Sequence, residues 1–314
     1  MSSTHAFRFG IQVSKADGGT GWAELARRAE GNGFSVLTMP DHFDDQLAPV
    51  PALMAAAAAT TTLRVGALVF DNDYKHPVVL AKELATIDVL SGGRLEIGLG
   101  AGWMISDYER SGMPYDAAGV RIDRFVEGVQ IIRGLLGPEP FSFTGQHYTV
   151  TEMNGLPKPV QARPPLLIGG GGKRVLGIAA READIVGINP SMHAGRIGPE
   201  AIGGMSPDSV EEKISIARAA AGARVHEIEW NVRSFLVNVT ADAAAGRTAR
   251  QQMAAAMGVD EAWLEASPFA LIGPPEELAE RLRERRERWG FSYVIVGGAD
   301  VDSFAPVVAE LAGT

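Results

Sequence analysis

The feature of this chain that most restricts its fold is a repeated alternation of short apolar runs with segments of helical length. In the first cycle, a strand-like run over 7–13 precedes a helical segment that carries Trp22 and Leu25 on its apolar face. The next apolar run begins at Phe34. Strand, helix and strand in succession form a βαβ unit, and repeated units of this kind build a parallel sheet. We therefore expect an α/β protein.

Eight such apolar runs occur along the 314 residues. Eight strands with intervening helices suit a closed (β/α)8 barrel, or TIM barrel, better than a smaller open sheet. No Pro- or Ser-rich linker divides the chain, so we expect a single domain over 1–314. The predicted strands cover 7–13, 34–40, 63–70, 94–100, 165–172, 184–190, 230–240 and 292–298.

Three segments fall outside this repeat and are predicted to be insertions. The alternation of apolar and polar residues around a glycine predicts a β-hairpin over 141–150. The Gly-, Pro- and Met-rich stretch 189–207 is too long for a routine connection and is predicted to be a lid or substrate loop. The stretch 241–270 is predicted to be a variable helical insertion. The Arg/Glu run at 276–288 is interpreted as a solvated helix face with i,i+4 ion pairs.

Composition excludes several functional classes. Without cysteine, the chain cannot form disulfides, thiolate metal sites or a cysteine nucleophile. The 29 basic and 38 acidic residues give a net charge of −9, which argues against nonspecific binding to nucleic acid or anionic lipid and favours a small organic substrate. The sequence shows no signal-peptide pattern and no apolar stretch of about 18 residues, so we expect a soluble cytoplasmic protein without a membrane partner.

The residues directly after the apolar runs are the candidates for catalysis, because a barrel enzyme forms its active site at the carboxyl ends of its strands. Asp41 and His42 follow the second run as the one adjacent carboxylate and imidazole pair at a predicted strand end. A carboxylate beside an imidazole can make it a proton donor or acceptor near neutrality. On its own, such a pair more often belongs to a structural network. The other histidines lack metal-binding spacing, so no metal site is predicted.

A run of glycines at 169–172 follows the fifth predicted strand and continues into Lys173 and Arg174. Glycines between a strand and a helix let backbone N–H groups reach an anion such as a cofactor phosphate, although a tight turn alone would also use them. The alternating glycines of 98–102 suit either a flat ring lying against bare backbone or close packing inside a barrel. Neither run fits the dinucleotide fingerprint, and the P-loop and G-x-S-x-G motifs are absent.

Together these motifs resemble those of the bacterial luciferase-like monooxygenase superfamily and, within it, of the F420-dependent oxidoreductases. The resemblance covers about 7–188 and 271–298, whereas 189–270 matches weakly. Its most specific pieces are PDHF (Pro40 to Phe43), YKHPVVLAKELATIDVLSGGRLEIGLGAGW (Tyr74 to Trp103), LLIGGGGKRVLGIAAREADIVG (Leu166 to Gly187) and GPPEELAERLRE near the end.

The resemblance implies a TIM barrel with insertions, a homodimer, and a cofactor at the carboxyl-terminal mouth of the barrel. It places Asp41 and His42 at the cofactor ring and the substrate, with His42 handling a proton and Asp41 orienting the ring or the histidine. Flavin-using members more often show another residue at the position of Asp41, so PDHF favours coenzyme F420 over FMN. A non-prolyl cis peptide that props the ring is implied at Leu68–Val69. The implied cofactor-binding residues are Asp41, Leu68, Val69, Gly100, Ala101, Gly102, Gly169, Gly170, Gly171, Gly172, Lys173 and Arg174.

We therefore expect an F420-dependent oxidoreductase that moves a hydride between the deazaflavin and a small, largely apolar alcohol, ketone or activated alkene. Phe43 and Trp103 are expected to line the substrate pocket. Trp103 stands where the F420-dependent sugar-phosphate dehydrogenases carry a catalytic Glu, so that substrate class is not expected and the indole would form an apolar wall. An FMN-dependent luciferase-like monooxygenase and a non-catalytic cofactor-binding protein on the same fold are the alternatives that stay open.

Overall fold

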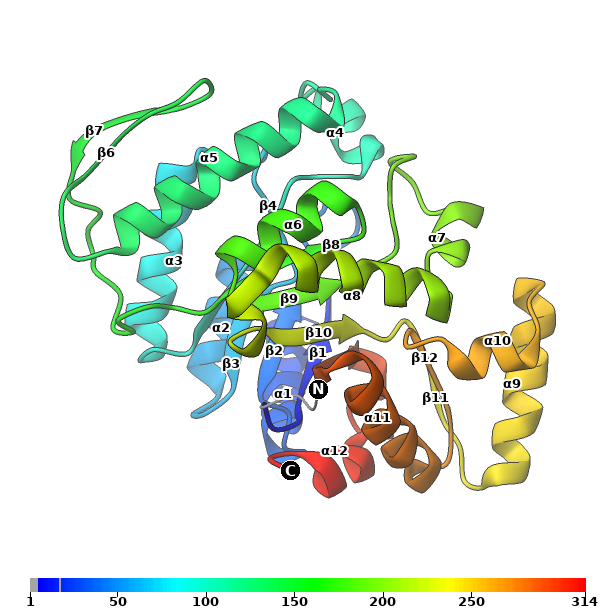
Figure 1. Cartoon of the computed structure of the whole chain (residues 1–314). Helices are drawn as coiled ribbons and strands as arrows, with labels where there is room; N and C mark the ends of the chain where they lie inside the picture. The colour runs from blue at the N-terminus through cyan, green and yellow to red at the C-terminus, as the bar shows by residue number, and fades with distance from the viewer. Residues whose placement is uncertain (1–4, 17) are drawn as a thin grey trace.

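The computed structural model describes residues 5–16 and 18–314 of the chain. A parallel sheet in the order β3-β2-β1-β13-β10-β9-β8-β5-β4 closes on itself, because β3 also pairs with β5. Since β3 and β4 are two pieces of one interrupted strand, the described residues form eight barrel strands, and the predicted (β/α)8 barrel is confirmed (Figure 1). The strands are β1 Arg8–Gln12, β2 Val36–Met39, β3 Arg64–Ala67, β4 Phe70–Asp71, β5 Leu95–Gly100, β8 Leu166–Gly170, β9 Ile185–Ile188, β10 Glu229–Arg233 and β13 Phe291–Gly297.

Helices lie around the barrel and bury their apolar faces against it (Figure 1). In α1, Trp22 and Leu25 are buried, as their spacing predicts. In the part of the chain that the structure describes, no helix is long and apolar enough to cross a membrane. The helices are α1 Gly18–Gly31, α2 Pro49–Ala59, α3 Pro77–Ser91, α4 Ile105–Ser111, α5 Ala118–Leu136, α6 Lys173–Glu182, α7 Pro199–Gly203, α8 Pro207–Ala221, α9 Ala243–Met257, α10 Glu261–Ala266, α11 Pro275–Trp289 and α12 Ala305–Leu311, with short 3-10 helices η1 Gly222–His226 and η2 Gly298–Asp300.

Two small two-stranded sheets stand apart from the barrel. The strands β6 and β7 pair antiparallel beside α5, which confirms the predicted hairpin (Figure 1). The strands β11 and β12 pair in parallel, and α9 and α10 connect them. The bounds are β6 Phe141–Thr144, β7 Thr149–Met153, β11 Leu236–Val239 and β12 Ala270–Gly273.

The prediction of one continuous strand over 230–240 is wrong. The barrel strand β10 ends at Arg233, and the chain resumes as β11 in the separate sheet. Ser234 marks the break, because it is fully buried and its backbone N–H donates to the Ile295 carbonyl at 2.9 Å. Its hydroxyl donates to the Pro268 carbonyl at 3.1 Å. These two hydrogen bonds hold the point at which the chain leaves the barrel.

The third barrel strand is interrupted at the peptide bond between Leu68 and Val69. This bond is cis, as the resemblance implies. The glycines of β5 leave room for the irregular backbone: a Cβ on Gly98 would lie 1.9 Å from the Ala67 carbonyl oxygen, and one on Gly100 would lie 2.5 Å from Cγ2 of Val69. The alternating glycines therefore serve close packing inside the barrel. A cofactor contact at Gly100 stays a prediction.

The charged helix α11 is only partly solvated, so the interpretation of its Arg/Glu run needs correction. Arg285 is 4% exposed and donates to the carbonyl oxygens of Ser267 at 2.6 Å and Ala270 at 2.9 Å. Burial lowers the pKa of Arg285 to about 9. The surface pair of Arg283 and Glu280, three residues apart at 3.2 Å, fits the solvated face that the sequence predicts. Arg285 instead connects α11 by hydrogen bonds to the first residue of β12 and to the residues just before it.

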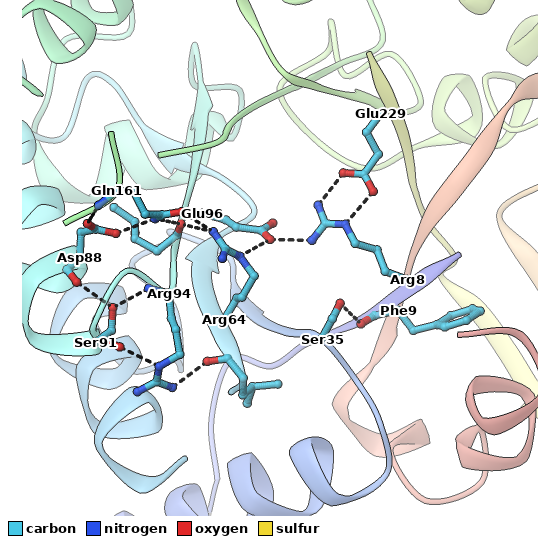
Figure 2. Close-up of polar contacts among 12 residues, drawn as sticks. Arg8, Phe9, Ser35, Arg64, Asp88, Ser91, Arg94, Glu96, Gln161 and Glu229 are labelled. Atoms are coloured by element: carbon cyan, nitrogen blue, oxygen red, sulfur yellow. Dashed lines mark hydrogen bonds and ion pairs between the residues drawn. The ribbon is translucent and has the colours of Figure 1, made fainter. Parts of the chain in front are cut away.

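Charged side chains fill the amino-terminal end of the barrel (Figure 2). Arg8 of β1 donates to Glu229 through Nε and Nη2, both at 2.7 Å, and to Glu96 through Nη1 at 2.5 Å. Arg64 donates to the same Glu96 oxygen at 2.8 Å. The Arg8 guanidinium also lies 3.6 Å from the centroid of the Tyr293 ring. These contacts join β1, β3, β5, β10 and β13, and they leave the carboxyl-terminal end of the barrel for a binding site.

The substitution Glu96→Gln is expected to destabilise the barrel. Burial alone would raise the pKa of Glu96, but Arg8 and Arg64 hold it below its ordinary value, so the stabilisation is present at neutral pH and is lost as the pH falls through the lowered pKa. Removing one partner of a buried ion pair costs about 3–5 kcal/mol. Urea unfolding at neutral pH should show that the variant has a free energy of unfolding lower by this amount. The difference between the variant and the unmodified protein should become smaller in acid. The exposed control Glu287→Gln should change little, and an equally small effect of Glu96→Gln would contradict the assignment.

Candidate active site at the mouth of the barrel

The carboxyl ends of the barrel strands meet at one rim because all of these strands run parallel. The strand β2 leads into Asp41 and His42, β4 leads into Tyr74, and β5 leads into Trp103. The helix α4, which follows β5, adds Asp107. The predicted carboxylate and imidazole pair therefore belongs to a larger group of polar and aromatic side chains at this rim.

The His42 imidazole is held by a buried carboxylate. Its Nδ1 lies 2.7 Å from Oδ2 of Asp107, a residue that is 4% exposed. The Tyr74 hydroxyl donates to the same oxygen at 2.8 Å, and the backbone N–H of Phe43 donates to Oδ1 at 3.4 Å. An ionised carboxylate only accepts hydrogen bonds, so Nδ1 carries the proton and the neutral ring keeps Nε2 as a proton acceptor. The imidazole is thus fixed in orientation and in tautomer.

Asp41 does not orient the histidine. Its Oδ2 accepts a hydrogen bond from the backbone N–H of Asp71 at 3.1 Å, and burial raises the pKa of its carboxyl. The residue that holds His42 is Asp107, which corrects one of the two roles predicted for Asp41. A contact of Asp41 with a cofactor ring stays a prediction. Asp107 lies within a helix and not directly after an apolar run, so inspection of the strand ends could not find it.

Aromatic side chains lie next to the His42 network. The Trp103 ring meets the imidazole edge-on with ring centroids 5.6 Å apart. The Phe43 ring packs on Tyr74 with centroids 4.4 Å apart, and Phe43 is 50% exposed. These rings make the surroundings of His42 partly apolar. That Phe43 and Trp103 contact a substrate stays a prediction.

Two acidic side chains at the end of β4, Asp71 within the strand and Asp73 after it, have unequal partners. Arg124 binds Asp73 through two hydrogen bonds of 2.7 and 2.9 Å. Asp71 is 7% exposed and accepts from the Tyr108 hydroxyl at 3.2 Å, while no ion pair with it forms among residues 5–16 and 18–314. Burial, followed by the nearby charges of Asp73 and Asp41, raises the pKa of Asp71 to about 7. Asp71 is therefore a buried carboxyl that exchanges its proton near neutral pH.

The predicted phosphate turn joins β8 to α6. Gly172 is the N-cap of α6 and, because it lacks a side chain, it offers no side-chain acceptor to the first N–H groups of the helix. A Cβ on Gly171 would lie 2.4 Å from the Pro190 carbonyl oxygen, so the close approach of the segment after β9 requires a glycine here. Uncapped N–H groups beside the exposed Lys173 amine are the donors that a phosphate needs. The turn fits a phosphorylated cofactor, and phosphate binding there stays a prediction.

Arg174, the second predicted cation of this turn, has partners on α5. Its guanidinium pairs with Asp123 and donates to the Gly119 carbonyl at 3.2 Å. Both side chains of the ion pair are 51% exposed. An exposed pair of this kind contributes about 0.2–1 kcal/mol, so an anion at the turn could compete with Asp123 for Arg174.

A partly buried cation that sequence analysis missed also lies at the strand ends. Arg233 closes β10, and its Nε donates to Oε1 of Gln12 at 2.9 Å. Gln12 in turn donates through Nε2 to the Leu68 carbonyl at 2.9 Å. Burial lowers the pKa of Arg233 to about 10. Because the prediction placed Arg233 inside a continuous strand, its position at a strand end could not be recognised.

The segment 189–207, predicted to be a lid, crosses the rim between β9 and α8. The Asn189 backbone N–H donates to the Gly170 carbonyl at 3.0 Å, and the Ile105 backbone N–H donates to the Gly195 carbonyl at 3.0 Å. The segment therefore connects the phosphate turn with the start of α4. Its role as a lid or substrate loop stays a prediction.

Known proteins resemble this chain in sequence. A family model described as luciferase-like monooxygenase matches residues 5–293. Among curated proteins, the FMNH(2)-dependent dimethylsulfone monooxygenase of Pseudomonas putida is 28% identical over 240 residues, which cover 73% of this chain and 62% of that protein. The chain thus spans less than two thirds of the length of this relative.

Solved structures share the whole fold at low sequence identity. The coenzyme F420-dependent tetrahydromethanopterin reductase of Methanopyrus kandleri has a TM-score of 0.76 and 21% identity, with 98% of this chain and 99% of that chain covered. An F420-dependent secondary alcohol dehydrogenase, solved with an F420-acetone adduct, has a TM-score of 0.77 and 17% identity, with 98% of both chains covered. At these identities the likeness concerns the fold.

The substitution Asp71→Asn is expected to stabilise the protein increasingly as the pH rises. The unfolded chain releases this proton near 3.8 and the folded chain only at about 7, so the buried carboxyl costs stability progressively between these values. An Asn side chain stays neutral, and its oxygen can still accept a hydrogen bond from the Tyr108 hydroxyl. Between pH 4 and 8, the free energy of unfolding of the variant minus that of the unmodified protein should increase by up to ~4 kcal/mol. Urea unfolding across this range measures it, with the exposed Asp260→Asn as control. A pH-independent difference would refute the raised pKa.

Proposed function

Because the chain belongs to the luciferase-like monooxygenase family, we propose that it is an F420-dependent oxidoreductase that moves a hydride between the deazaflavin and a small, largely apolar alcohol, ketone or activated alkene. The observation that carries this proposal is the His42 imidazole that Asp107 fixes at the mouth of the barrel. Hydride transfer to or from such a substrate needs a proton donor or acceptor, and an imidazole with a defined tautomer suits this task.

His42 handles the proton in this proposal, and the bound deazaflavin supplies the carbon that accepts or donates the hydride. In alcohol oxidation, Nε2 of His42 takes the hydroxyl proton while the substrate carbon loses a hydride, which leaves a ketone. Asp107 stabilises the imidazolium through the 2.7 Å contact with Nδ1. In the reverse direction, the imidazolium returns the proton to the ketone oxygen. Tyr74, which donates to the same Asp107 oxygen at 2.8 Å, helps to hold that carboxylate in place.

The choice of F420 over FMN rests on the PDHF motif and on the chemistry of similar proteins. Two solved structures of the same fold are F420-dependent enzymes. An FMN-dependent monooxygenase is the second candidate, because the dimethylsulfone monooxygenase with 28% identity uses FMNH(2). A non-catalytic cofactor-binding protein on the same barrel is the third, and the intact pair of His42 and Asp107 argues against it.

The proposed assembly is a homodimer, as the resemblance implies. Its support in the structure is an exposed apolar surface on α3, where Val79 is 51% and Leu90 is 66% exposed in the single chain. Apolar side chains of this size gain stability when a partner covers them. The remaining partner in the proposal is the small organic substrate.

Titration of the purified protein with F420 and FMN side by side tests the cofactor assignment. We expect F420 to bind at low micromolar concentration or tighter, and FMN to bind at least ~10-fold more weakly, a difference of about 1.4 kcal/mol. Deazaflavin fluorescence and equilibrium dialysis measure the two dissociation constants. Tight FMN binding accompanied by oxygen consumption would defeat the deazaflavin assignment and favour the monooxygenase.

The substitution Asp107→Asn tests the proton path. It removes the charge that stabilises the His42 imidazolium but keeps the size of the side chain, so we expect turnover of a secondary alcohol to fall ~100-fold with the F420 dissociation constant unchanged. His42→Ala should lose at least as much. The pH dependence of kcat should move in Asp107→Asn and stay the same in the exposed control Asp260→Asn. Unchanged turnover in both site variants would remove His42 from the mechanism.

A further inference from the structure

A groove of about 760 Å³ runs along the outer face of α6, between this helix and α8. Three cationic side chains of α6 line it, together with small and apolar residues of both helices. None of the described residues that line the groove is acidic. The lining residues include Lys173, Arg174, Gly177, Arg181, Ile216 and Ala219.

The charge of this groove departs from that of the whole chain, which carries a net charge of −9. Arg174 pairs with Asp123 of α5. Among the ion pairs of the described residues, none involves Lys173 or Arg181, and both side chains are exposed. The groove therefore offers at least two cations that pair with no carboxylate among residues 5–16 and 18–314.

Arg181 is not needed to end its own helix. A basic residue in the last turn often stabilises the carbonyl groups there. In α6 this task belongs to Arg224, which donates to the Arg181 carbonyl, to the Ala180 carbonyl at 3.0 Å and to the Ala183 carbonyl at 2.9 Å. The Arg181 guanidinium instead lies back along the helix, with Nη1 3.4 Å from the position of a Cβ on Gly177. It therefore extends into the groove and toward the start of α6.

The groove begins at the predicted phosphate turn and leads away from the mouth of the barrel. Lys173 is the first residue of α6 and Arg181 lies near its last, which places them about 12 Å apart along the axis at 1.5 Å per residue. An extended chain covers at most ~3.6 Å per residue. A single anion held at the turn lies at the Lys173 end of the groove, whereas a chain that repeats carboxylates over several units can also extend to Arg181.

We infer that this groove binds the oligoglutamate tail of F420, with the cofactor phosphate at the turn of Gly169 to Gly172 and the tail carboxylates along Lys173 and Arg181. The inference rests on the proposed function. FMN ends at its phosphate and has no group to place along the groove. F420 continues beyond its phosphate with a row of carboxylates, so charge complementarity in the groove would select F420 over FMN. Ile216 and Ala219 of α8 provide the apolar floor against which the methylene groups of the glutamyl units pack.

The test compares the affinity of three ligands for the full-length protein: F420 with its tail, the F420 form without glutamates, and FMN. In the unmodified protein, the tail should tighten binding ~3- to 10-fold. Arg181→Gln should reduce that advantage ~2- to 5-fold and leave the tail-less form unaffected, since one exposed ion pair contributes about 0.2–1 kcal/mol. Arg247→Gln on α9, also an exposed arginine in a helix, is the matched control and should change nothing.

A second variant tests the groove without removing a cation. Gly177→Glu places a carboxylate four residues from both Lys173 and Arg181, where it can pair with each of them. It should abolish the advantage of the tail while the tail-less form binds as before. Circular dichroism shows that each variant is folded.

The outcomes separate the two proposals. Equal affinity for the tailed and tail-less forms in the unmodified protein overturns the groove and leaves the F420 assignment standing. A tail advantage that is undiminished in Arg181→Gln and Gly177→Glu does the same. Binding of FMN but of neither F420 form overturns both. A tail advantage that is reduced in Arg181→Gln, lost in Gly177→Glu and kept in Arg247→Gln supports the inference.

Discussion

Closure of the barrel depends on how closely the backbones of β3 and β5 approach each other. A Cβ on Gly66 would lie 2.3 Å from the Glu96 carbonyl oxygen, and one on Gly98 would lie 1.9 Å from the Ala67 carbonyl oxygen. Only glycine lacks the atom that would collide at these positions. Once the sheet closes, its parallel strands end at one rim, and the parts of the active site come together there. His42 and Asp107, which are 65 positions apart in the sequence, then form a hydrogen bond of 2.7 Å.

The two ends of the barrel hold their charges in different ways. At the amino-terminal end, Arg8 is bound by Glu96 and Glu229, so buried charges are matched and the network serves stability. At the mouth, Asp71 is buried with a raised pKa, and the Arg233 guanidinium has a neutral partner in Gln12. Perturbed pKa values of this kind are typical of functional sites, and structural networks such as that of Glu96 also produce them. The same barrel thus separates a stabilising end from an end suited to chemistry.

The helix α6 connects the fold with the question of which cofactor binds. Its first turn begins at a bare Gly172, which suits the phosphate that FMN and F420 share. Its outer face carries Lys173 and Arg181 along a groove, where the proposed tail of F420 would bind. Because solved structures of this fold include both an FMN complex and an F420-dependent enzyme, the fold alone does not select between the two cofactors, and local surfaces must do so.

The sequence by itself determined the closed barrel, the hairpin and the glycine turn before α6, because strand and helix periodicities and turn chemistry depend on neighbours along the chain. Resemblance added the position of the cis bond at Leu68–Val69. Only the tertiary structure decided that Asp107 and not Asp41 holds His42, that the strand predicted over 230–240 divides at Ser234, and that Arg285 is buried. In each of these cases the deciding partner is remote in sequence, and its distance is set by closure of the sheet and not by local pattern.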